Sequence, residues 1–445
     1  MKINQLSKYF IFFISFTFLL LQTSCQDNDD TIYISQENLN NKLVVDWFTL
    51  QNQLVKTTPN CPPPIAARNF GYAGITLYQS LYKGMNGKNL QTKIQGLDGI
   101  PTGDGNNYIW SLVANAAMAE IELRLFENTS SENKALIASL ETNLLAHYVA
   151  ANSLTNQVLI DKSILLGKQI AIAVYESSKT DGGHQAHANL FPASYIIPTG
   201  PSLWVSTAPN YPQVPLLPYW GSNRTLLAIN DANSFTVNPP LAYSEDTASP
   251  FYASAMEVYT TVNTITPDQD VIAHFWADAG GTVTPPGHMM AIVLQLIQDE
   301  QLNLFDASRL ICKVGIGLYD AAIVCWRTKY QHNLLRPITY IRAHIDPNWN
   351  TIITTPPFPA YTSGHSTFSG VTATILANQF GVTYSFSDNT KIADGFQARS
   401  FTSFQAMANE AALSRLYGGI HFTFDNQEGL TCGNIIATNV NNLGL

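Results

Sequence analysis

The chain has 445 residues, of which 46% are hydrophobic and 12% are charged, and its formal net charge is −9. This composition is typical of a globular protein with a large buried core, and the length allows two or three domains. With 23 Lys and Arg against 32 Asp and Glu, the chain lacks the broad basic surface that nucleic-acid binding requires. Any cationic site must therefore be local.

The first residues carry an export pattern. Lys2 and Lys8 precede the apolar run YFIFFISFTFLLL, which is followed by QTSC. The run is too short to span a membrane, so the pattern predicts a signal peptide over 1–24. Cys25 resembles the lipidated cysteine of bacterial lipoproteins, which would make 25–42 a tether. We expect an exported protein, either an outer-membrane or cell-surface lipoprotein or a periplasmic or secreted protein.

Helical periodicity begins directly after the tether. Leu43, Trp47, Leu50 and Leu54 recur at helical spacing, and the pattern continues through PPIAARNFGYAGITLYQSLY and YIWSLVANAAMAEIELRLF. The sequence therefore predicts an N-terminal helical half over 43–179.

The middle of the chain differs in composition. Ten of the 23 prolines fall within 180–250, which predicts a long ordered connection. Helical periodicity returns over 251–445, with loops at 278–287 and 343–363. The predicted fold class is all-α, with two packed helical bundles joined by the Pro-rich connection and the chemistry in the C-terminal bundle.

Four cysteines follow Cys25, namely Cys61, Cys312, Cys325 and Cys432. They lack the CxxC spacing that is typical of a zinc site. Two interpretations stay open: some form disulfides, as an exported chain permits, or all are buried thiols without a chemical role.

The stretch RTKYQHNLLRP, residues 327–337, places Lys329 and Arg336 seven residues apart. Seven residues is almost two helical turns, so the spacing predicts two cations on one side of a helix that Pro337 ends. Such a pair usually lies on a solvated face. By itself it does not indicate a site.

A second stretch, PPFPAYTSGHSTFSG, passes from a Pro-rich loop to a predicted helix. Ser363 and Gly364 lie at the junction, where free backbone N–H groups attract an anion. His365 follows directly, and a histidine titrates near neutral pH, which suits proton transfer.

A third stretch, SRLYGGIHFTFD, contains Arg415, His421 and Asp425. On one unbroken helix Arg415 and His421 would point apart, but Gly418-Gly419 predicts a break that lets them converge. Asp425 can accept one ring N–H of His421 and leave the other nitrogen as a nucleophile or metal ligand. Together the three stretches predict a pocket for a tetrahedral oxyanion such as phosphate or vanadate.

The three stretches resemble the signature shared by the vanadium-dependent haloperoxidases and the type 2 phosphatidic acid phosphatases. Longer segments, FWADAGGTVTPPGH (275–288), DAAIVCWRTKY (320–330) and IRAHIDPNWNTIITTPPFPAYTSGHS (341–366), are similar to the haloperoxidase branch. The resemblance implies a helical-bundle fold and a vanadate cofactor, whose site phosphate can also occupy. It further implies that hydrogen peroxide oxidises a halide to hypohalous acid, which then attacks an unknown organic acceptor.

The resemblance also assigns roles to residues. His421 would bind vanadium, and His365 would act as acid and base. The vanadate oxygens would be held by Lys329, Arg336, Ser363, Gly364 and Arg415.

Two further pairs of residues receive expected roles. Asp278 and Asp425 are expected to offset the arginines and to orient His421. Trp326 and Phe358 match the aromatic pair of chloroperoxidase-like members, which favours chloride over bromide. One departure from the family pattern is Thr362, which stands where proline usually precedes SGH.

Two other functions fit the same residues. In a soluble acid phosphatase of this superfamily, His421 would attack phosphorus and His365 would protonate the leaving group. A non-catalytic surface lipoprotein that binds an anion or a glycan is the third hypothesis, and it leaves the two histidines unexplained.

Overall fold

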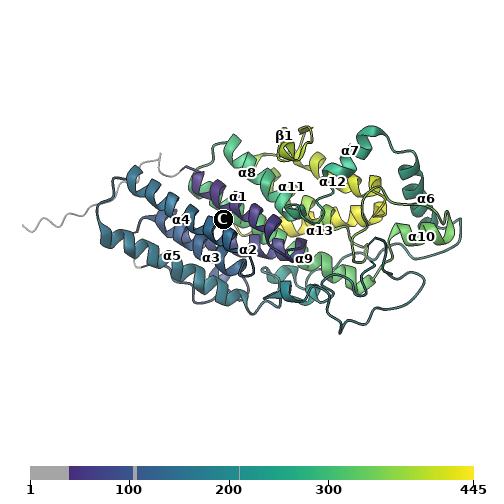
Figure 1. Cartoon of the computed structure of the whole chain (residues 1–445), viewed down its shortest axis with the longest axis horizontal. Coiled ribbons are helices and arrows are strands. Elements are labelled where there is room, and N and C mark those ends of the chain that lie inside the picture. The colour runs from purple at the N-terminus through teal and green to yellow at the C-terminus, as the bar shows by residue number, and fades with distance from the viewer. Residues whose placement is uncertain (1–39, 104–107, 210) are drawn as a thin grey trace, which may run out of the picture. The chain divides into compact units, whose positions relative to one another are not determined.

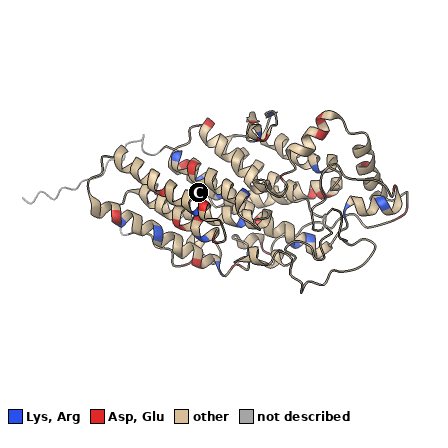
Figure 2. Cartoon of the chain, viewed as in Figure 1, with Lys and Arg blue, Asp and Glu red and all other residues tan. Residues whose placement is uncertain are grey.

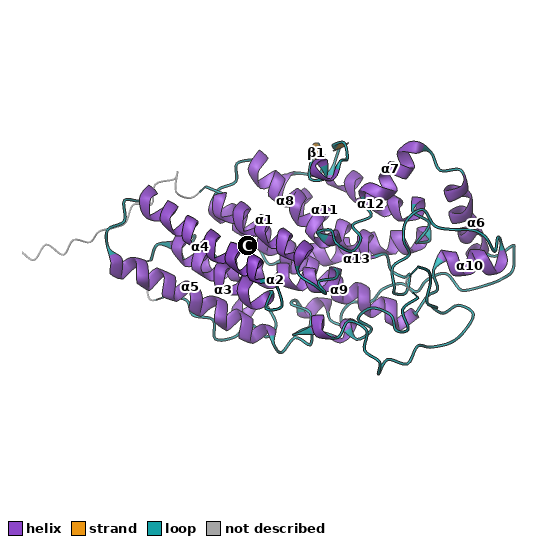
Figure 3. Cartoon of the chain, viewed as in Figure 1, coloured by secondary structure: helices purple, strands orange, loops and turns teal. Residues whose placement is uncertain are grey.

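A computed structural model describes residues 40–103, 108–209 and 211–445 of the chain. Across these ranges the regular structure consists of thirteen α-helices, a few short 3-10 turns and one two-stranded sheet (Figures 1 and 3). The predicted all-α fold class is confirmed. The predicted signal peptide and Cys25 lie outside the described residues. None of the described helices is long and apolar enough to cross a membrane.

The N-terminal helices are α1 (Lys42–Thr57), α2 (Pro63–Leu81), α3 (Trp110–Leu125), α4 (Ser131–Ala151) and α5 (Gln157–Ser178). Local signals start them: Ser130 and Asn156 each accept a backbone N–H bond as N-caps of α4 and α5. Helix α2 is buried on every side from Pro64 to Leu81, so it forms the interior of this group of helices.

The Pro-rich connection contains no α-helix in its described residues up to Ser249, only 3-10 turns at Ala186–Ala188, Trp220–Ser222 and Ala228–Asn230. Specific contacts hold it against the helices. The carboxylate of Asp320 accepts bonds from the backbone N–H groups of Leu226 (2.6 Å) and Leu227 (3.1 Å). Burial raises the pKa of Asp320 to about 7.

The C-terminal helices are α6 (Pro250–Asn263), α7 (Pro267–Phe275), α8 (Thr284–Asp299), α9 (Leu304–His332), α10 (Pro337–His344), α11 (Gly364–Phe380), α12 (Phe404–Tyr417) and α13 (Thr423–Asn441). A small hairpin, β1 (Phe386–Asp388) and β2 (Arg399–Phe401), joins α11 to α12. The predicted loop at 278–287 is shorter than expected, because α8 already begins at Thr284. The expected domain boundaries stay predictions.

Helices α2 and α9 touch through their backbones. A Cβ atom added at Gly315 would lie 2.6 Å from the carbonyl oxygen of Phe70, and one at Gly71 would lie 2.9 Å from Cβ of Tyr319. One added at Gly74 would lie 3.1 Å from the carbonyl oxygen of Ile311. Residues later in α2 contact residues earlier in α9. The two helices therefore run antiparallel, and the start of α2 lies toward the end of α9.

The close contact predicts that Gly315→Ala destabilises the chain. The added methyl group must push two helix backbones apart, which lowers the free energy of unfolding by about 1–3 kcal/mol. Denaturant unfolding measures this loss. Gly280→Ala, whose Cβ meets nothing within 4 Å, is the matched control and is expected to change stability by less than about 0.5 kcal/mol. Equal stability of both variants would contradict the backbone contact.

Candidate active site

Charged residues are spread thinly over the helices (Figure 2), yet three basic side chains are buried together. Lys329 and Arg336 are 0% exposed and Arg415 is 2% exposed. Burial lowers the pKa of Arg336 to about 10 and that of Arg415 to about 9, and it also lowers the pKa of Lys329. Burying like charges is unfavourable unless acceptors or an anion compensate. The cluster therefore indicates an anion site.

Lys329 and Arg336 do not share a helix. Helix α9 ends at His332, and Asn333 after it adopts the left-handed conformation, with φ 46°. Arg336 precedes α10, and Pro337 is the first residue of that helix. The prediction of one helix ended by Pro337 is therefore wrong. Proline suits the first turn of a helix, where its missing N–H is not required. Both cations nevertheless reach the same loop, 358–362.

Lys329 binds that loop with its whole ammonium group. Nζ donates to the carbonyl oxygens of Pro359 (2.9 Å), Ala360 (2.9 Å) and Thr362 (2.6 Å). An ammonium has three N–H donors, so all of them are used. Lys329 therefore fixes the loop before Ser363 and brings a positive charge, but it has no spare donor for an oxyanion.

Arg336 keeps one donor free. Its Nε donates to the carbonyl oxygen of Phe358 (2.9 Å), and its Nη1 donates to that of Ile420 (2.8 Å). Nη1 also lies 3.0 Å from Nε2 of His421. The remaining nitrogen, Nη2, is buried and has no hydrogen-bond partner in the described part of the chain.

His421 is held as a neutral ring. Its Nδ1 lies 2.9 Å from Oδ2 of Asp425, as predicted from their spacing, so Nδ1 carries the proton and Nε2 carries the lone pair. Burial, followed by the charges of Arg336 and Lys329, holds the pKa of His421 well below its usual range. That lone pair accepts a bond from Nη1 of Arg336, and Nε2 can act as a metal ligand or a nucleophile at neutral pH when a ligand takes the place of this bond.

Ser363 and Gly364 begin α11, as the sequence predicted. Ser363 is the N-cap and its Oγ accepts a long bond from the N–H of Ser366 (3.4 Å). The N–H of Ser363 donates to the carbonyl oxygen of Asp425 (3.0 Å). A Cβ atom at Gly429 would lie 2.7 Å from the carbonyl oxygen of Ser363. This close approach of α13 brings His421 and the start of α11 to one place.

His365 and Arg415 share a partner, the backbone carbonyl of Trp276. Nη1 of Arg415 donates to this carbonyl oxygen at 2.8 Å, and the His365 ring also forms a hydrogen bond with the Trp276 backbone. Burial and the nearby Arg415 charge hold the pKa of His365 well below its usual range. Nε2 of His365 and Nε of Arg415 are buried without a partner in the described residues.

The helix break between Arg415 and His421 is confirmed. Helix α12 ends at Tyr417, Gly418 caps it, and Gly419 takes a left-handed φ of 77°. Arg415 then lies in the last turn of α12, and His421 lies just before α13 begins.

A buried ionic network, which the sequence did not reveal, lies behind this site. Nδ1 of His288 is 2.8 Å from Oδ2 of Asp278, and Nε2 is 3.0 Å from Oδ2 of Asp388. Nζ of Lys391 lies 2.6 Å from Oδ1 of Asp278. The His288 ring stacks on Trp276, with ring centroids 4.7 Å apart. Although burial opposes it, the two carboxylates raise the pKa of His288 to about 9.

No local motif joins these residues. Asp388 and Lys391 lie on or beside the hairpin, about a hundred residues from His288 along the chain. Two signals were available: His288, a histidine inside a segment similar to the haloperoxidases, and Asp278 in the same segment, for which a different role was expected.

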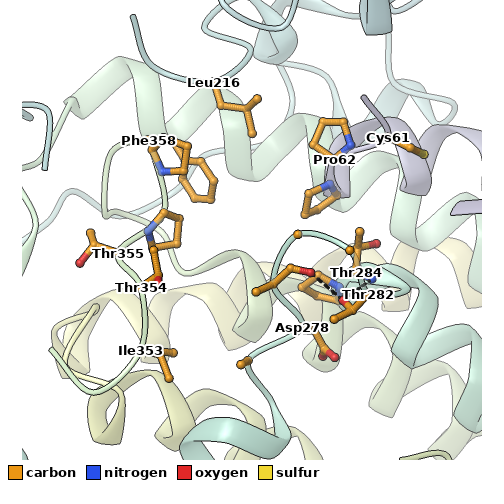
Figure 4. A pocket seen from close by; sticks show the side chains of 18 of the residues that line it. Cys61, Pro62, Leu216, Asp278, Thr282, Thr284, Ile353, Thr354, Thr355 and Phe358 are labelled. Carbon is orange, nitrogen blue, oxygen red and sulfur yellow. Dashed lines mark hydrogen bonds between the residues drawn. The ribbon is translucent and has the colours of Figure 1, made fainter. Parts of the chain in front are cut away.

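A cavity of about 840 Å³ lies in front of the site (Figure 4). His365, Arg415 and Asp278 line its inner end, and the segments 55–63 and 352–358 form two of its walls. Lys329, Arg336, Ser363, Gly364, His421 and Asp425 do not line it and lie deeper. Of the predicted halide pair, Phe358 lines the cavity. Trp326 is buried behind it, with ring centroids 5.1 Å apart.

The residues present fit a vanadate group. Arg336 Nη2, Arg415 Nε and His365 Nε2 are buried without protein partners in the described chain, and guanidinium donors suit a tetrahedral oxyanion. The first turn of α11 offers further N–H groups at Gly364 and His365. The lone pair of His421 Nε2 supplies a metal ligand. Phosphate, which has the same shape and charge sign, fits the same donors.

Comparisons with known proteins agree with this geometry. Residues 309–443 match the family model described as the VCPO second helical-bundle domain. The sequence is 22% identical to the vanadium chloroperoxidase of Curvularia inaequalis, over 87% of this chain and 80% of that protein.

Among solved structures, the fold is similar to one described as the first bacterial vanadium-dependent iodoperoxidase. That match has a TM-score of 0.82 and 30% identity, and it covers 91% of this chain and 96% of the other. The fold is also similar to an apo-type bacterial vanadium-dependent chloroperoxidase, with a TM-score of 0.64, 12% identity, and coverage of 86% and 94%. Because the 30% identity extends over nearly all of both chains, this chain belongs to the family of vanadium-dependent haloperoxidases.

Proposed function

We propose that the protein is a vanadate-dependent haloperoxidase, which uses hydrogen peroxide to oxidise a halide to hypohalous acid. One peroxide, one halide and one proton give one hypohalous acid and one water. The observation that carries the proposal is the neutral His421, whose Nε2 lone pair lies among three buried cations. Bound vanadate would supply a Lewis acid that polarises the oxidant without changing its own oxidation state.

The cations stabilise the negative charge of the oxyanion. Arg336 and Arg415 offer the donors, because Nη2 of one and Nε of the other are unpartnered in the described chain. Lys329 contributes charge and holds loop 358–362 in place. In a buried site these fixed charges act more strongly than they would in water.

The two histidines have different roles: His421 is the metal ligand and His365 transfers protons. Asp425 orients His421 through Nδ1, so that Nε2 faces the oxyanion site. His365 is neutral at neutral pH and lines the cavity. It can therefore take a proton from an incoming peroxide and return one to the leaving oxygen.

His288 supports Arg415 and His365 indirectly. It ties Asp278 to Asp388 on the hairpin and stacks on Trp276, whose carbonyl binds Arg415 and His365. The network thus holds the 276–278 segment against the inner end of the cavity. We regard His288 as a positioning residue.

We propose iodide as a halide that the enzyme oxidises. The support is the similar structure described as an iodoperoxidase, which is 30% identical over nearly the whole chain. The Trp326–Phe358 pair favoured chloride on resemblance alone, so the assays below include iodide, bromide and chloride.

Metal-free protein supplied with orthovanadate is expected to show peroxide-dependent halide oxidation. His421→Ala removes the metal ligand and should lower the rate by more than about 100-fold. Formation of triiodide and of hypobromous or hypochlorous acid is measured directly, beside hydrolysis of a phosphate ester. His147→Ala, an exposed histidine of α4, is the control and should retain the rate. Phosphate ester hydrolysis without halide oxidation would support the acid phosphatase instead.

Inorganic phosphate is expected to compete with vanadate, since both are tetrahedral oxyanions and would use the same donors. Halide oxidation is measured during reconstitution with a fixed vanadate concentration and increasing phosphate. The vanadate concentration needed for half-maximal activity should rise in proportion to phosphate. Sulfate at matched ionic strength separates competition from screening. Reconstitution that ignores excess phosphate would contradict a shared site.

His288→Gln is expected to destabilise the fold most at acidic to neutral pH. The pKa of His288 is about 9 in the folded chain and 6.5 ordinarily. The protonated ring therefore stabilises the fold fully below the ordinary value, and this stabilisation disappears as pH rises through 9. A shift of this size corresponds to about 3 kcal/mol. The difference in unfolding free energy between wild type and variant should therefore shrink between about pH 6 and about pH 10.

Chemical unfolding at several pH values checks this trend, with His147→Gln, a substitution of the same kind at an exposed position of α4, as the matched control. A difference that stays constant with pH would mean that His288 contributes packing alone.

A further inference from the structure

The backbone carbonyl of Trp276 connects two side chains at the inner end of the cavity. Nη1 of Arg415 donates to its oxygen at 2.8 Å, and the His365 ring forms a hydrogen bond with the Trp276 backbone. Nε of Arg415 and Nε2 of His365 remain without a partner in the described chain. The position of Trp276 therefore sets where these two nitrogens lie in the proposed oxyanion site.

The backbone around Trp276 is regular on one side only. Trp276 caps the end of α7, and its N–H donates to the carbonyl oxygen of Ile272 at 3.2 Å. Beyond it the chain forms a loop over 277–283, until α8 begins at Thr284. Because a helix end has few backbone bonds to hold it, contacts of the Trp276 side chain must fix the carbonyl.

A hydrogen bond ties the Trp276 side chain to α12, which packs against α7 (Figure 1). Nε1 of the indole donates to Oε1 of Glu410 at 3.0 Å. Glu410 precedes Arg415 in the same helix, and their separation corresponds to about 7.5 Å along the helix axis. Helix α12 therefore holds Trp276 at two points, the indole through Glu410 and the carbonyl through Arg415.

Arg399 of β2 fixes the Glu410 carboxylate in turn. Nε of Arg399 donates to Oε1 at 2.6 Å, and Nη2 donates to Oε2 at 2.8 Å. Two parallel bonds between a guanidinium and a carboxylate restrict the rotation of both groups. The two side chains are only 19% and 20% exposed, so the pair is more firmly held than a solvated surface pair. Glu410 therefore presents Oε1 to the indole in one orientation.

Burial of an indole does not by itself require such a bond in this protein. The Nε1 atoms of Trp204, Trp220 and Trp349 are also buried, and none of them has a hydrogen-bond partner within the described residues. The indole of Trp276, whose carbonyl meets Arg415, is bonded to a carboxylate that is itself held in place. This contrast indicates that the bond serves to position Trp276.

Packing against neighbouring rings complements this bond. The His288 ring stacks on the indole with centroids 4.7 Å apart and an angle of 24° between the planes. The Phe275 ring meets the indole edge-on, with centroids 5.2 Å apart. Stacking fixes the plane of a ring more firmly than its position within that plane. A hydrogen bond depends strongly on direction, so Glu410 fixes the in-plane position that stacking leaves open.

We propose that Glu410 is a positioning residue for the oxyanion site. It holds the Trp276 indole, and the Trp276 carbonyl then aligns Arg415 and His365. The charge of Glu410 is paired with Arg399, so Glu410 acts through the position of Trp276 and not through its own electric field. The inference rests on the proposed function, which supplies the oxyanion.

The first experiment measures binding without turnover. Orthovanadate is titrated by calorimetry into the metal-free protein, with neither peroxide nor halide present. Glu410→Met removes the acceptor and keeps a side chain of similar size, so it should weaken binding about tenfold, as is usual when a residue that orients a ligand is lost. Glu410→Gln keeps an Oε1 acceptor for the indole and should bind within about threefold of wild type. Unchanged binding by Glu410→Met overturns the proposal.

Glu120→Met in α3 is the matched control for a general loss of stability. The Glu120 side chain is also 20% exposed and is paired with an arginine, Arg124, at 2.6 Å. Glu120→Met should bind orthovanadate like wild type, even where denaturant unfolding shows that both variants are equally destabilised. Weakening of binding by Glu120→Met to the same extent as by Glu410→Met would overturn the positioning role.

Trp276→Phe tests the same bond from its other end. It keeps the pair of Glu410 with Arg399 and an aromatic ring beside His288, but it removes the N–H donor. Binding should again weaken about tenfold. The double variant with Glu410→Met should bind no more weakly than either single variant, because both changes break one bond. Additive losses, or wild-type binding by Trp276→Phe, would contradict the proposal.

The second experiment separates this inference from the proposed function. Halide oxidation is measured at saturating orthovanadate, so that weaker binding no longer limits the rate. Glu410→Met should still lower kcat at least about fivefold, because His365 is misaligned for proton transfer, and Glu410→Gln should restore it. Halide oxidation by wild type and Glu410→Met at equal kcat, with equal binding, overturns the positioning role alone. Absent halide oxidation in a wild type that binds orthovanadate overturns the proposed function alone, and a wild type that binds none overturns both.

Discussion

The structure depends on how the charges of three buried side chains, Lys329, Arg336 and Arg415, are compensated away from water. The ammonium of Lys329 donates all three of its N–H bonds to carbonyl oxygens of loop 358–362. Two nitrogens of Arg336 donate to the carbonyl oxygens of Phe358 and Ile420. Backbone carbonyls thus compensate part of the buried charge, and Nη2 of Arg336 and Nε of Arg415 are left without a partner in the described chain. In the proposed function, a bound oxyanion would compensate the rest of this positive charge.

Much of this arrangement could be predicted from local sequence. The helical periodicity gave the fold class, the SGH junction gave the start of α11, and Gly418-Gly419 gave the break that separates Arg415 from His421. These features depend on a few consecutive residues, whose backbone preferences act without distant partners. The family resemblance added a vanadate cofactor and roles for the two histidines, and the two roles stay predictions.

The rest depends on contacts between distant segments, which local patterns do not specify. Pro337 begins a helix instead of ending one, because the chain leaves α9 through the left-handed Asn333 and returns with Arg336 as the next cap. His288 meets Asp278 and Asp388 only once the hairpin folds back. The cavity wall at 55–63 comes from a part of the chain in which no motif indicated chemistry.

The backbone contact between α2 and α9 also bears on the position of one cavity wall. Segment 55–63 leads directly into α2, and Lys329 lies in the last turn of α9, so this cavity wall and one of the three buried cations are attached to two helices in backbone contact. Gly71 lies eight residues after Pro63, about 12 Å along the helix. A larger side chain at Gly71 or Gly74 would act as a spacer between the two helices and move one wall without touching any residue of the chemistry. Glycines that do not line the cavity thereby help to place one of its walls.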